Sequence, residues 1–176
     1  MVRSEWVFAE ELRHILATLT PENRIACEVS LATGLRIDDV LHIRTEQLKS
    51  NKITVREMKT GKTRRVYIPQ NLLECMRVIS GRKWVFQGRT NVYKTRTRQA
   101  VWKDLKRSAD LFRVKVNLTP HSCRKVYAVT EYHRSGSIKR VQELLNHSSE
   151  AVTFLYALSD ELTLRRLGAK KRKQCI

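Results

Sequence analysis

This chain of 176 residues lacks the cysteine pattern of a metal-binding or disulfide-bonded protein. Its cysteines, Cys27, Cys75, Cys123 and Cys175, are far apart, and none belongs to a C-x-x-C pair. Zinc sites and disulfide frameworks depend on recurrent cysteine spacings, so we expect reduced thiols. Metal-ligand spacing and a glycine-rich phosphate loop are also missing, and we therefore expect no cofactor.

Long hydrophobic runs are missing as well. No stretch approaches the roughly 20 apolar residues that a helix needs to span a bilayer. The N-terminus has no signal-peptide pattern, and no long apolar helix carries a basic flank. We therefore expect an intracellular protein without a membrane partner.

Acidic residues are few, which leaves the chain strongly basic. Lys and Arg number 35 against 17 Asp and Glu, for a formal charge of +18 and a pI near 10.3. Such a balance favours a polyanionic partner, nucleic acid first, although a solvated basic surface of the ribosomal kind is the alternative. The length suits one domain with a full core.

Helix signals dominate the chain. Thr20 and Pro21 provide the N-cap and first position of a helix that should end at Gly34, which suits a left-handed C-cap. Thr119 and Pro120 begin another helix in the same way. The chain should therefore fold mainly as α-helices.

Strand signals occur in one short region. Residues 52–58 and 64–68 alternate between apolar and polar side chains, and K-T-G-K at 59–62 lies between them. These segments predict a β-hairpin, and residues 84–86 predict a third, short strand beside it. The expected fold class is mainly α with a small antiparallel sheet of about three strands.

Cations and small polar residues then fill residues 87–98. Flexible cations beside hydroxyl groups are typical of phosphate contacts. A linker is the alternative, but the hydrophobic runs on both sides favour a loop that lines a groove. The helix expected over 99–111 should bury Val101, Leu105 and Leu111. The candidate phosphate contacts in the loop are Arg89, Lys94, Arg96 and Arg98.

The segment 119–156 concentrates histidine, arginine and tyrosine. His121 and Arg124 are three residues apart and so lie on one helix face, whereas His147 and Tyr156 follow later. Each has an ordinary explanation, as a helix cap, a core histidine or a core aromatic residue with a paired hydroxyl. Their order and spacing favour a site for an anionic substrate.

Five motifs in the chain together resemble the tyrosine recombinases, the phage integrase family. The resemblance implies a catalytic domain of that family, with two arginines, one lysine and two histidines around a DNA phosphate and a tyrosine as nucleophile. The motifs are G-L-R at 34–36, M-K-T-G-K at 58–62, H-S-C-R at 121–124, L-L-N-H-S-S at 144–149 and T-F-L-Y at 153–156. The implied catalytic residues are Arg36, Lys59, His121, Arg124, His147 and Tyr156.

The chemistry of these side chains fits the implied reaction. Two guanidinium groups, from Arg36 and Arg124, bind the non-bridging phosphate oxygens bidentately, and His147 donates a further hydrogen bond. Attack by Tyr156 gives a 3′-phosphotyrosyl intermediate. Because this link keeps the phosphoester energy, strand exchange needs neither metal nor nucleotide.

Proton transfer requires two further groups. The tyrosine hydroxyl has a pKa of about 10 in free form and needs an acceptor, for which His121 is placed. Lys59 is the expected general acid for the leaving 5′ oxygen. Lys62 competes for this role, but the family's lysine opens the turn, so Lys62 is expected to contact backbone phosphate. Arg64 and Lys125 are two further expected DNA contacts.

The chain departs from the family pattern near three of these groups. Asp39 stands where glutamate usually follows the first arginine, and a hydrogen bond to Arg36 is still expected. Ser122 and Lys125 flank the second arginine, where Asp and His are common. Asn146 replaces the glycine before the late histidine.

The resemblance also predicts the domain organisation and assembly. Residues 1–168 should form one catalytic domain, residues 169–176 a basic tail, and the family's N-terminal core-binding domain should be absent. Residues 157–168 are expected to dock on a neighbouring subunit through three leucines, with packing in cis as the alternative. The expected assembly is a tetramer on double-stranded DNA that is weak or monomeric without it.

Function and location follow as expectations. The chain should be a site-specific DNA recombinase or integrase, encoded by a bacterial, archaeal or viral mobile element and acting in the cytoplasm at the nucleoid. A type IB topoisomerase shares the chemistry and is the nearest alternative. A non-catalytic DNA-binding protein on the same scaffold is the other.

Overall fold

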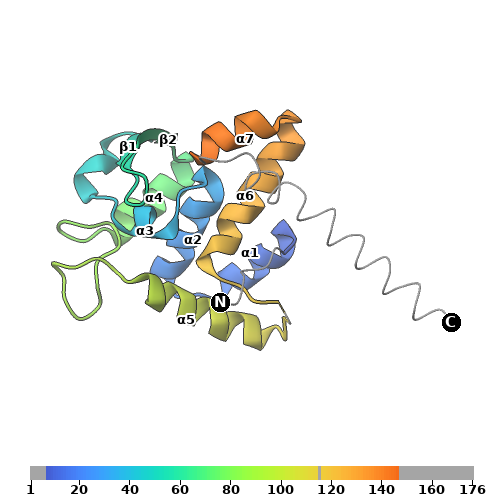
Figure 1. Cartoon of the computed structure of the whole chain (residues 1–176). Helices are drawn as coiled ribbons and strands as arrows, with labels where there is room; N and C mark the ends of the chain where they lie inside the picture. The colour runs from blue at the N-terminus through green and yellow to red at the C-terminus, as the bar shows by residue number, and fades with distance from the viewer. Residues whose placement is uncertain (1–6, 115, 147–176) are drawn as a thin grey trace.

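The computed structural model describes residues 7–114 and 116–146, which form a mainly helical domain with one small antiparallel sheet (Figure 1). This confirms the predicted fold class. No helix in these two ranges is long and apolar enough to cross a membrane. The elements are α1 (Ala9–Ala17), α2 (Pro21–Thr33), α3 (Ile37–Leu41), a 3-10 helix η1 (Thr45–Lys49), β1 (Lys52–Arg56), β2 (Thr63–Tyr67), α4 (Gln70–Ile79), α5 (Arg98–Leu111), α6 (Pro120–Ser135) and α7 (Ile138–Leu145).

Helices α2 and α6 lie side by side at the centre of the domain (Figure 1). Along α2 the buried residues recur on most sides of the helix, as expected of a helix surrounded by others. Cys27 of α2 and Cys123 of α6 are both fully buried where the helices meet, and neither forms a disulfide. These two helices therefore fix the relative positions of the elements that cover them.

A buried carboxylate connects α5 to the start of α2. Asp104 Oδ2 accepts hydrogen bonds from the backbone and hydroxyl of Thr20 and from Asn23 Nδ2, at 2.8–2.9 Å. Burial alone would raise the pKa of Asp104, but the hydrogen bonds from Asn23, Arg107 and Thr20 outweigh it and lower the pKa to about 2. Thr20 is the N-cap residue of α2 as predicted, but its hydroxyl binds Asp104 and makes no capping hydrogen bond to the helix.

The end of α2 leads directly into α3. Gly34 has a φ of 66°, the left-handed conformation predicted for this C-cap. Arg36 is the N-cap residue of α3, and its neighbours Leu35 and Val40 are fully buried. The chain therefore holds Arg36 in a short turn between two packed helices.

The hairpin of β1 and β2 is confirmed, with Val55 paired to Arg64 and Ile53 to Val66. The predicted third strand is not part of this sheet. Trp84 forms a single antiparallel bridge with Arg44 instead. The physical reason is that a turn, closed by the hydrogen bond from the Gly81 amide to the Trp84 carbonyl, leaves this segment too short to extend the pairing.

The predicted inward position of Leu111 in α5 is wrong, because its side chain is 64% exposed. The buried residues of α5 are Val101, Asp104, Leu105, Ser108 and Ala109, which recur every three or four positions. Leu111 continues this spacing three residues after Ser108, but it is the last residue of α5, where the buried stripe has already ended.

Helices α6 and α7 begin and end as their capping residues dictate. Thr119 and Ser122 form a reciprocal capping box at the start of α6, and Ser137 caps α7. Asn146 ends α7 with a φ of 54°. Asparagine tolerates this conformation better than most residues, which explains how it replaces the family's glycine.

Gly34 and Gly136 have the same left-handed backbone conformation but differ in packing, so substitutions at the two positions should cost different amounts of stability. A Cβ on Gly34 would lie 2.5 Å from the Tyr127 ring, whereas one on Gly136, at φ +64°, would meet nothing within 4 Å. We expect Gly136→Ala to cost about 1 kcal/mol of unfolding free energy through backbone strain alone. Gly34→Ala should cost roughly 1–3 kcal/mol more because of overpacking.

Urea unfolding of the two variants measures this difference. Equal losses for Gly34→Ala and Gly136→Ala would show that the packing of α2 against Tyr127 does not constrain the fold.

Candidate functional site

Four of the six predicted catalytic residues fall in the described part of the chain. Arg36 lies in the α2–α3 turn, Lys59 in the hairpin turn, and His121 and Arg124 in the first turns of α6. The other two predicted catalytic residues, His147 and Tyr156, lie outside the described residues.

The side chain of Arg124 is almost fully buried, at 1% exposure. Its Nη1 donates to the Gly34 carbonyl at 2.5 Å, and its Nη2 donates to the Leu145 carbonyl. Gly34 is the C-cap of α2 and Leu145 is the last residue of α7. Carbonyl groups at helix C-termini lack intrahelical donors and carry partial negative charge, so a guanidinium group stabilises both ends.

Arg64 of β2 binds the same two helix ends. Its Nη2 donates to the Thr33 carbonyl at 2.9 Å, and its Nη1 donates to the Leu144 carbonyl. The side chain is 11% exposed. Burial lowers the pKa of Arg64, and the charge of Glu57 opposes that shift. The structure places the Arg64 guanidinium between two helices, and its predicted role as a DNA contact stays a prediction.

Arg36 is held by a carboxylate that the sequence reasoning missed. Glu57 Oε2 accepts from Arg36 Nη1 at 2.6 Å and from the Thr60 hydroxyl at 2.9 Å, and its side chain is fully buried. Burial raises the pKa of Glu57, but the hydrogen bonds from Thr60 and Arg36 outweigh this effect and lower it. The sequence does carry a signal for this contact, because Glu57 is an acidic residue at an inward-facing position of the alternating pattern of residues 52–58.

Asp39 does not make the hydrogen bond to Arg36 that was expected from its position. Its Oδ1 instead accepts from the Met58 amide at 2.9 Å. Burial raises the pKa of Asp39, and the nearby charge of Glu57 adds to this shift. The shorter side chain therefore holds the hairpin backbone, and Glu57 takes the arginine.

These two carboxylates fix both sides of Lys59. Met58 is bound to Asp39, and Thr60 is bound to Glu57. Lys59 and Lys62 are both exposed, and Lys59 stands between the two residues that Asp39 and Glu57 hold. The assignment of the catalytic role to Lys59 rather than Lys62 stays a prediction.

His121 lies beside the two arginines and remains accessible to solvent. Partial burial lowers the pKa of His121, and the positive charges of Arg124, Arg36 and Lys125 lower it further. A neutral imidazole near pH 7 can accept a proton, which suits the predicted role.

The remaining predicted phosphate contacts divide into two groups. Arg96 is turned towards α2, where its Nε donates to Asn23 Oδ1 at 2.5 Å and its Nη2 lies 3.6 Å from Glu22. Its guanidinium is bound within the fold, and its predicted DNA contact stays a prediction. Lys125 is half-buried, and the exposed candidates are Lys62, Arg89, Lys94 and Arg98.

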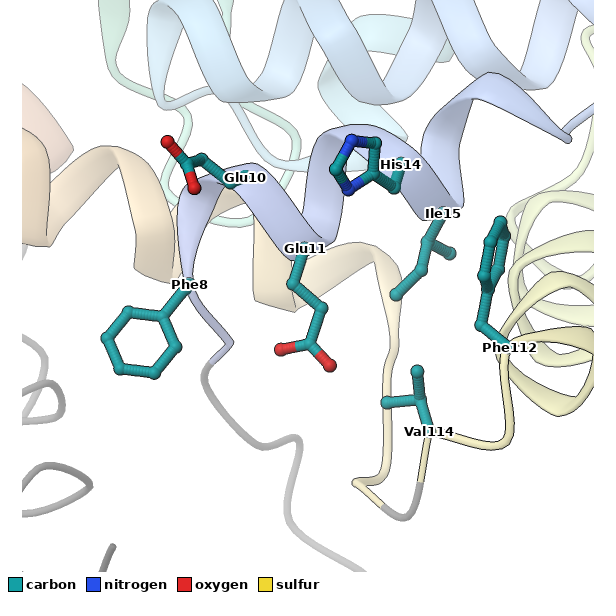
Figure 2. A pocket seen from close by; sticks show the side chains of 7 residues that line it. All are labelled: Phe8, Glu10, Glu11, His14, Ile15, Phe112 and Val114. Carbon is teal, nitrogen blue, oxygen red and sulfur yellow. The ribbon is translucent and has the colours of Figure 1, made fainter. Parts of the chain in front are cut away.

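A cavity of about 460 Å³ lies elsewhere, between the start of α1 and the chain after α5 (Figure 2). None of the four predicted catalytic residues in the described part of the chain lines it. Among the described residues, no group of three or more His, Cys, Asp or Glu side chains is placed to hold a metal ion. The cavity is lined by Phe8, Glu10, Glu11, His14, Ile15, Phe112 and Val114. The candidate site is a different region, the surface over the buried Arg124.

The contacts of Arg64 predict that its substitution destabilises the fold, whereas substitution of the exposed Arg65 should not. Arg64→Gln removes donors from two helix-end carbonyls and a counter-charge from Glu57, so we expect a loss of roughly 2–4 kcal/mol of unfolding free energy. Arg65→Gln, on the exposed face of the same strand, should change stability by less than about 0.5 kcal/mol. Denaturant unfolding compares the two, and a loss of similar size in both would contradict this placement of Arg64.

The environment of His121 predicts a low pKa. An NMR titration, with His121→Gln to assign the resonance, should give a pKa below 6.5, the usual value of a histidine side chain. Because the unfolded chain then takes up the proton first, protonation of His121 should lower stability as the pH falls from 6.5 to the folded pKa. Removal of a neighbouring charge, as in Arg98→Gln, should raise the His121 pKa, and a pKa of 6.5 or higher in the wild type would contradict this electrostatic arrangement.

Comparison with known sequences gives a match to the model of the phage integrase family over residues 5–162. The tyrosine recombinase XerA of Pyrococcus furiosus is 28% identical over 179 residues, covering 95% of this chain and 59% of that protein. The tyrosine recombinase XerD of Staphylococcus aureus is 27% identical over 156 residues, covering 82% of this chain and 52% of that protein. The chain thus spans about half the length of the curated relatives it matches.

Solved structures agree in fold. A crystal structure of XerA recombinase superposes with a TM-score of 0.72 at 19% identity, covering 97% of this chain and 66% of that one. A lambda integrase fragment, solved as a dimer bound to a COC′ core site, gives a TM-score of 0.71 at 20% identity, covering 89% and 60%. Because the family model spans most of the sequence, this chain belongs to the phage integrase family.

Proposed function

We propose that this chain is the catalytic part of a site-specific DNA recombinase. It cuts and rejoins DNA strands through a 3′-phosphotyrosyl intermediate at Tyr156. The observation that supports this most directly is the convergence of Arg36, Arg124 and His121 with the Lys59 turn, from segments far apart in the chain. This collection of cations and a neutral imidazole matches the charge that develops on a phosphodiester under attack.

The proposed first step transfers a phosphoryl group from a DNA oxygen to tyrosine. The Tyr156 oxygen attacks phosphorus and gives its proton to His121, and the bond from phosphorus to the 5′ oxygen breaks. Lys59 donates a proton to that oxygen. Arg36 and Arg124 bind the non-bridging oxygens, with a hydrogen bond from His147. Reversal by the 5′ hydroxyl of another strand rejoins the DNA, without metal or nucleotide.

The proposed partner is double-stranded DNA. The formal charge of +18 and the exposed cations Lys62, Arg89, Lys94 and Arg98 support phosphate contacts, which give strong salt dependence. The lambda integrase fragment that shares this fold was solved on its DNA core site. We further propose that the chain comes from a bacterial, archaeal or viral mobile element and acts on cytoplasmic, nucleoid-associated DNA.

The proposed assembly is a tetramer on DNA, weak or monomeric without it. Residues 1–168 form the catalytic domain in this proposal, and residues 157–168 dock on a neighbouring subunit. These docking residues and the basic tail 169–176 lie outside the described part of the chain. Leu162, Leu164 and Leu167 supply the apolar side chains for such docking.

Two alternatives to a recombinase use the same site but predict different outcomes on DNA. A type IB topoisomerase would form the same covalent link but relax supercoiled DNA without joining two partners. A non-catalytic DNA-binding protein would form no link. The family match supports the recombinase, because the relatives of this chain include proteins named tyrosine recombinases.

Trapping of a covalent adduct tests the catalytic proposal. The full chain is incubated with a pool of nicked duplexes of random sequence, in which cleavage beside the nick releases a short 5′ fragment and prevents rejoining. We expect the wild type to form a protein–DNA adduct that survives denaturation and is destroyed by protease. Tyr156→Phe should form none, whereas Tyr67→Phe, an exposed tyrosine on β2, should react as the wild type does.

The trapped DNA also decides between the alternatives. Its recovered sequence, placed twice in a plasmid, should recombine, and native sizing of the trapped complex should give four subunits. An adduct that persists in Tyr156→Phe would refute the nucleophile, and absence of any wild-type adduct would favour the non-catalytic reading. Relaxation without exchange would favour a topoisomerase.

A further inference from the structure

Glu57 is the group at this site that neither the motifs nor the proposed reaction assigns. It follows the last residue of β1 and precedes Lys59 by two positions. A fully buried carboxylate is costly unless it is paired with charge and hydrogen-bonded. Its contacts therefore indicate what the chain gains from it.

One oxygen of Glu57 joins two segments of the site. Oε2 accepts from Arg36 Nη1 at 2.6 Å, in the α2–α3 turn, and from the Thr60 hydroxyl at 2.9 Å, in the hairpin turn. The other oxygen, Oε1, lies 3.8 Å from Arg64 Nε. The carboxylate thus compensates two guanidinium groups that would otherwise repel each other at close range.

The geometry leaves Arg36 available to a phosphate. A guanidinium group has five N–H donors. Within residues 7–114 and 116–146, the side chain of Arg36 makes one hydrogen bond, to Glu57. Its side chain is 17% exposed, so the bound edge faces the interior and part of the group reaches the surface.

We propose that Glu57 is a positioning residue, which fixes the Arg36 guanidinium and the Lys59 turn relative to each other at the phosphate site. Asp39, where the family pattern places a carboxylate, binds the Met58 amide and leaves the arginine to Glu57. This inference rests on the proposed function, because it assigns Glu57 a part in that reaction through Arg36 and Lys59.

Single-turnover adduct formation tests the proposal. The substrate is a nicked duplex that the wild type has selected from the random pool, with protein in excess. Glu57→Gln keeps the shape of the side chain but removes the charge, and we expect adduct formation to slow roughly 10- to 100-fold through misplacement of Arg36 and Lys59. The DNA dissociation constant should stay within about threefold of the wild type, because most phosphate contacts remain.

A matched control and a milder variant separate positioning from folding. Glu28→Gln removes a carboxylate that pairs with Arg24 at 2.8 Å on the outside of α2, and it should leave the adduct rate unchanged. Thr60→Val, at an exposed position, removes one hydrogen bond to Glu57 without removing the buried charge. It should slow adduct formation about 3- to 10-fold, with a smaller loss of melting temperature than Glu57→Gln gives.

Two results would overturn the assignment. One is an adduct rate in Glu57→Gln and Thr60→Val that equals the wild type. The other is a rate loss that parallels equal losses in DNA affinity and melting temperature, as a merely structural residue would give. If the wild type forms no adduct, the proposed function fails, and NMR relaxation of the Arg36 guanidinium then decides the positioning role: motion should be restricted in the wild type and free in Glu57→Gln. A freely rotating Arg36 in the wild type would refute it.

Discussion

The fold around the candidate site depends on two arginines that bind the same pair of helix ends. Arg64 and Arg124 donate to consecutive carbonyls at the end of α2, those of Thr33 and Gly34, and to consecutive carbonyls at the end of α7. Two helix C-termini carry partial negative charges that repel each other. Guanidinium groups between them turn that repulsion into attraction and bring the start of α6, the hairpin and the end of α7 together.

Two buried carboxylates lie next to these arginines. Glu57 and Asp39 are buried within the same cluster and hold Arg36 and the Met58 amide. The result is an alternating set of cations and anions in which each buried charge has a partner of opposite sign or a hydrogen bond. Such a network is costly to assemble and costly to leave incomplete, which favours one geometry over others.

The sequence predicted the local structure where a residue type has a local physical cause. Thr119 caps α6, Gly34 ends α2 and the 59–62 turn closes a hairpin, as expected, because each depends on neighbouring backbone groups alone. Predictions that needed distant partners were less accurate. Trp84 of the predicted 84–86 strand pairs with Arg44 instead of the hairpin, and Leu111 is exposed because the buried stripe ends before the last residue of α5.

For the site, the sequence alone determined the candidate catalytic side chains, since their order and spacing are properties of the chain. It also determined the excess of positive charge that favours DNA. Only the tertiary structure decided which cations face solvent. Arg64 and Arg96 look like their exposed neighbours in sequence, but contacts across 80 and 73 positions turn them inward. Likewise only the folded chain brings Glu57 to Arg36, because a buried charge is bound by whichever opposite charge the packing places beside it.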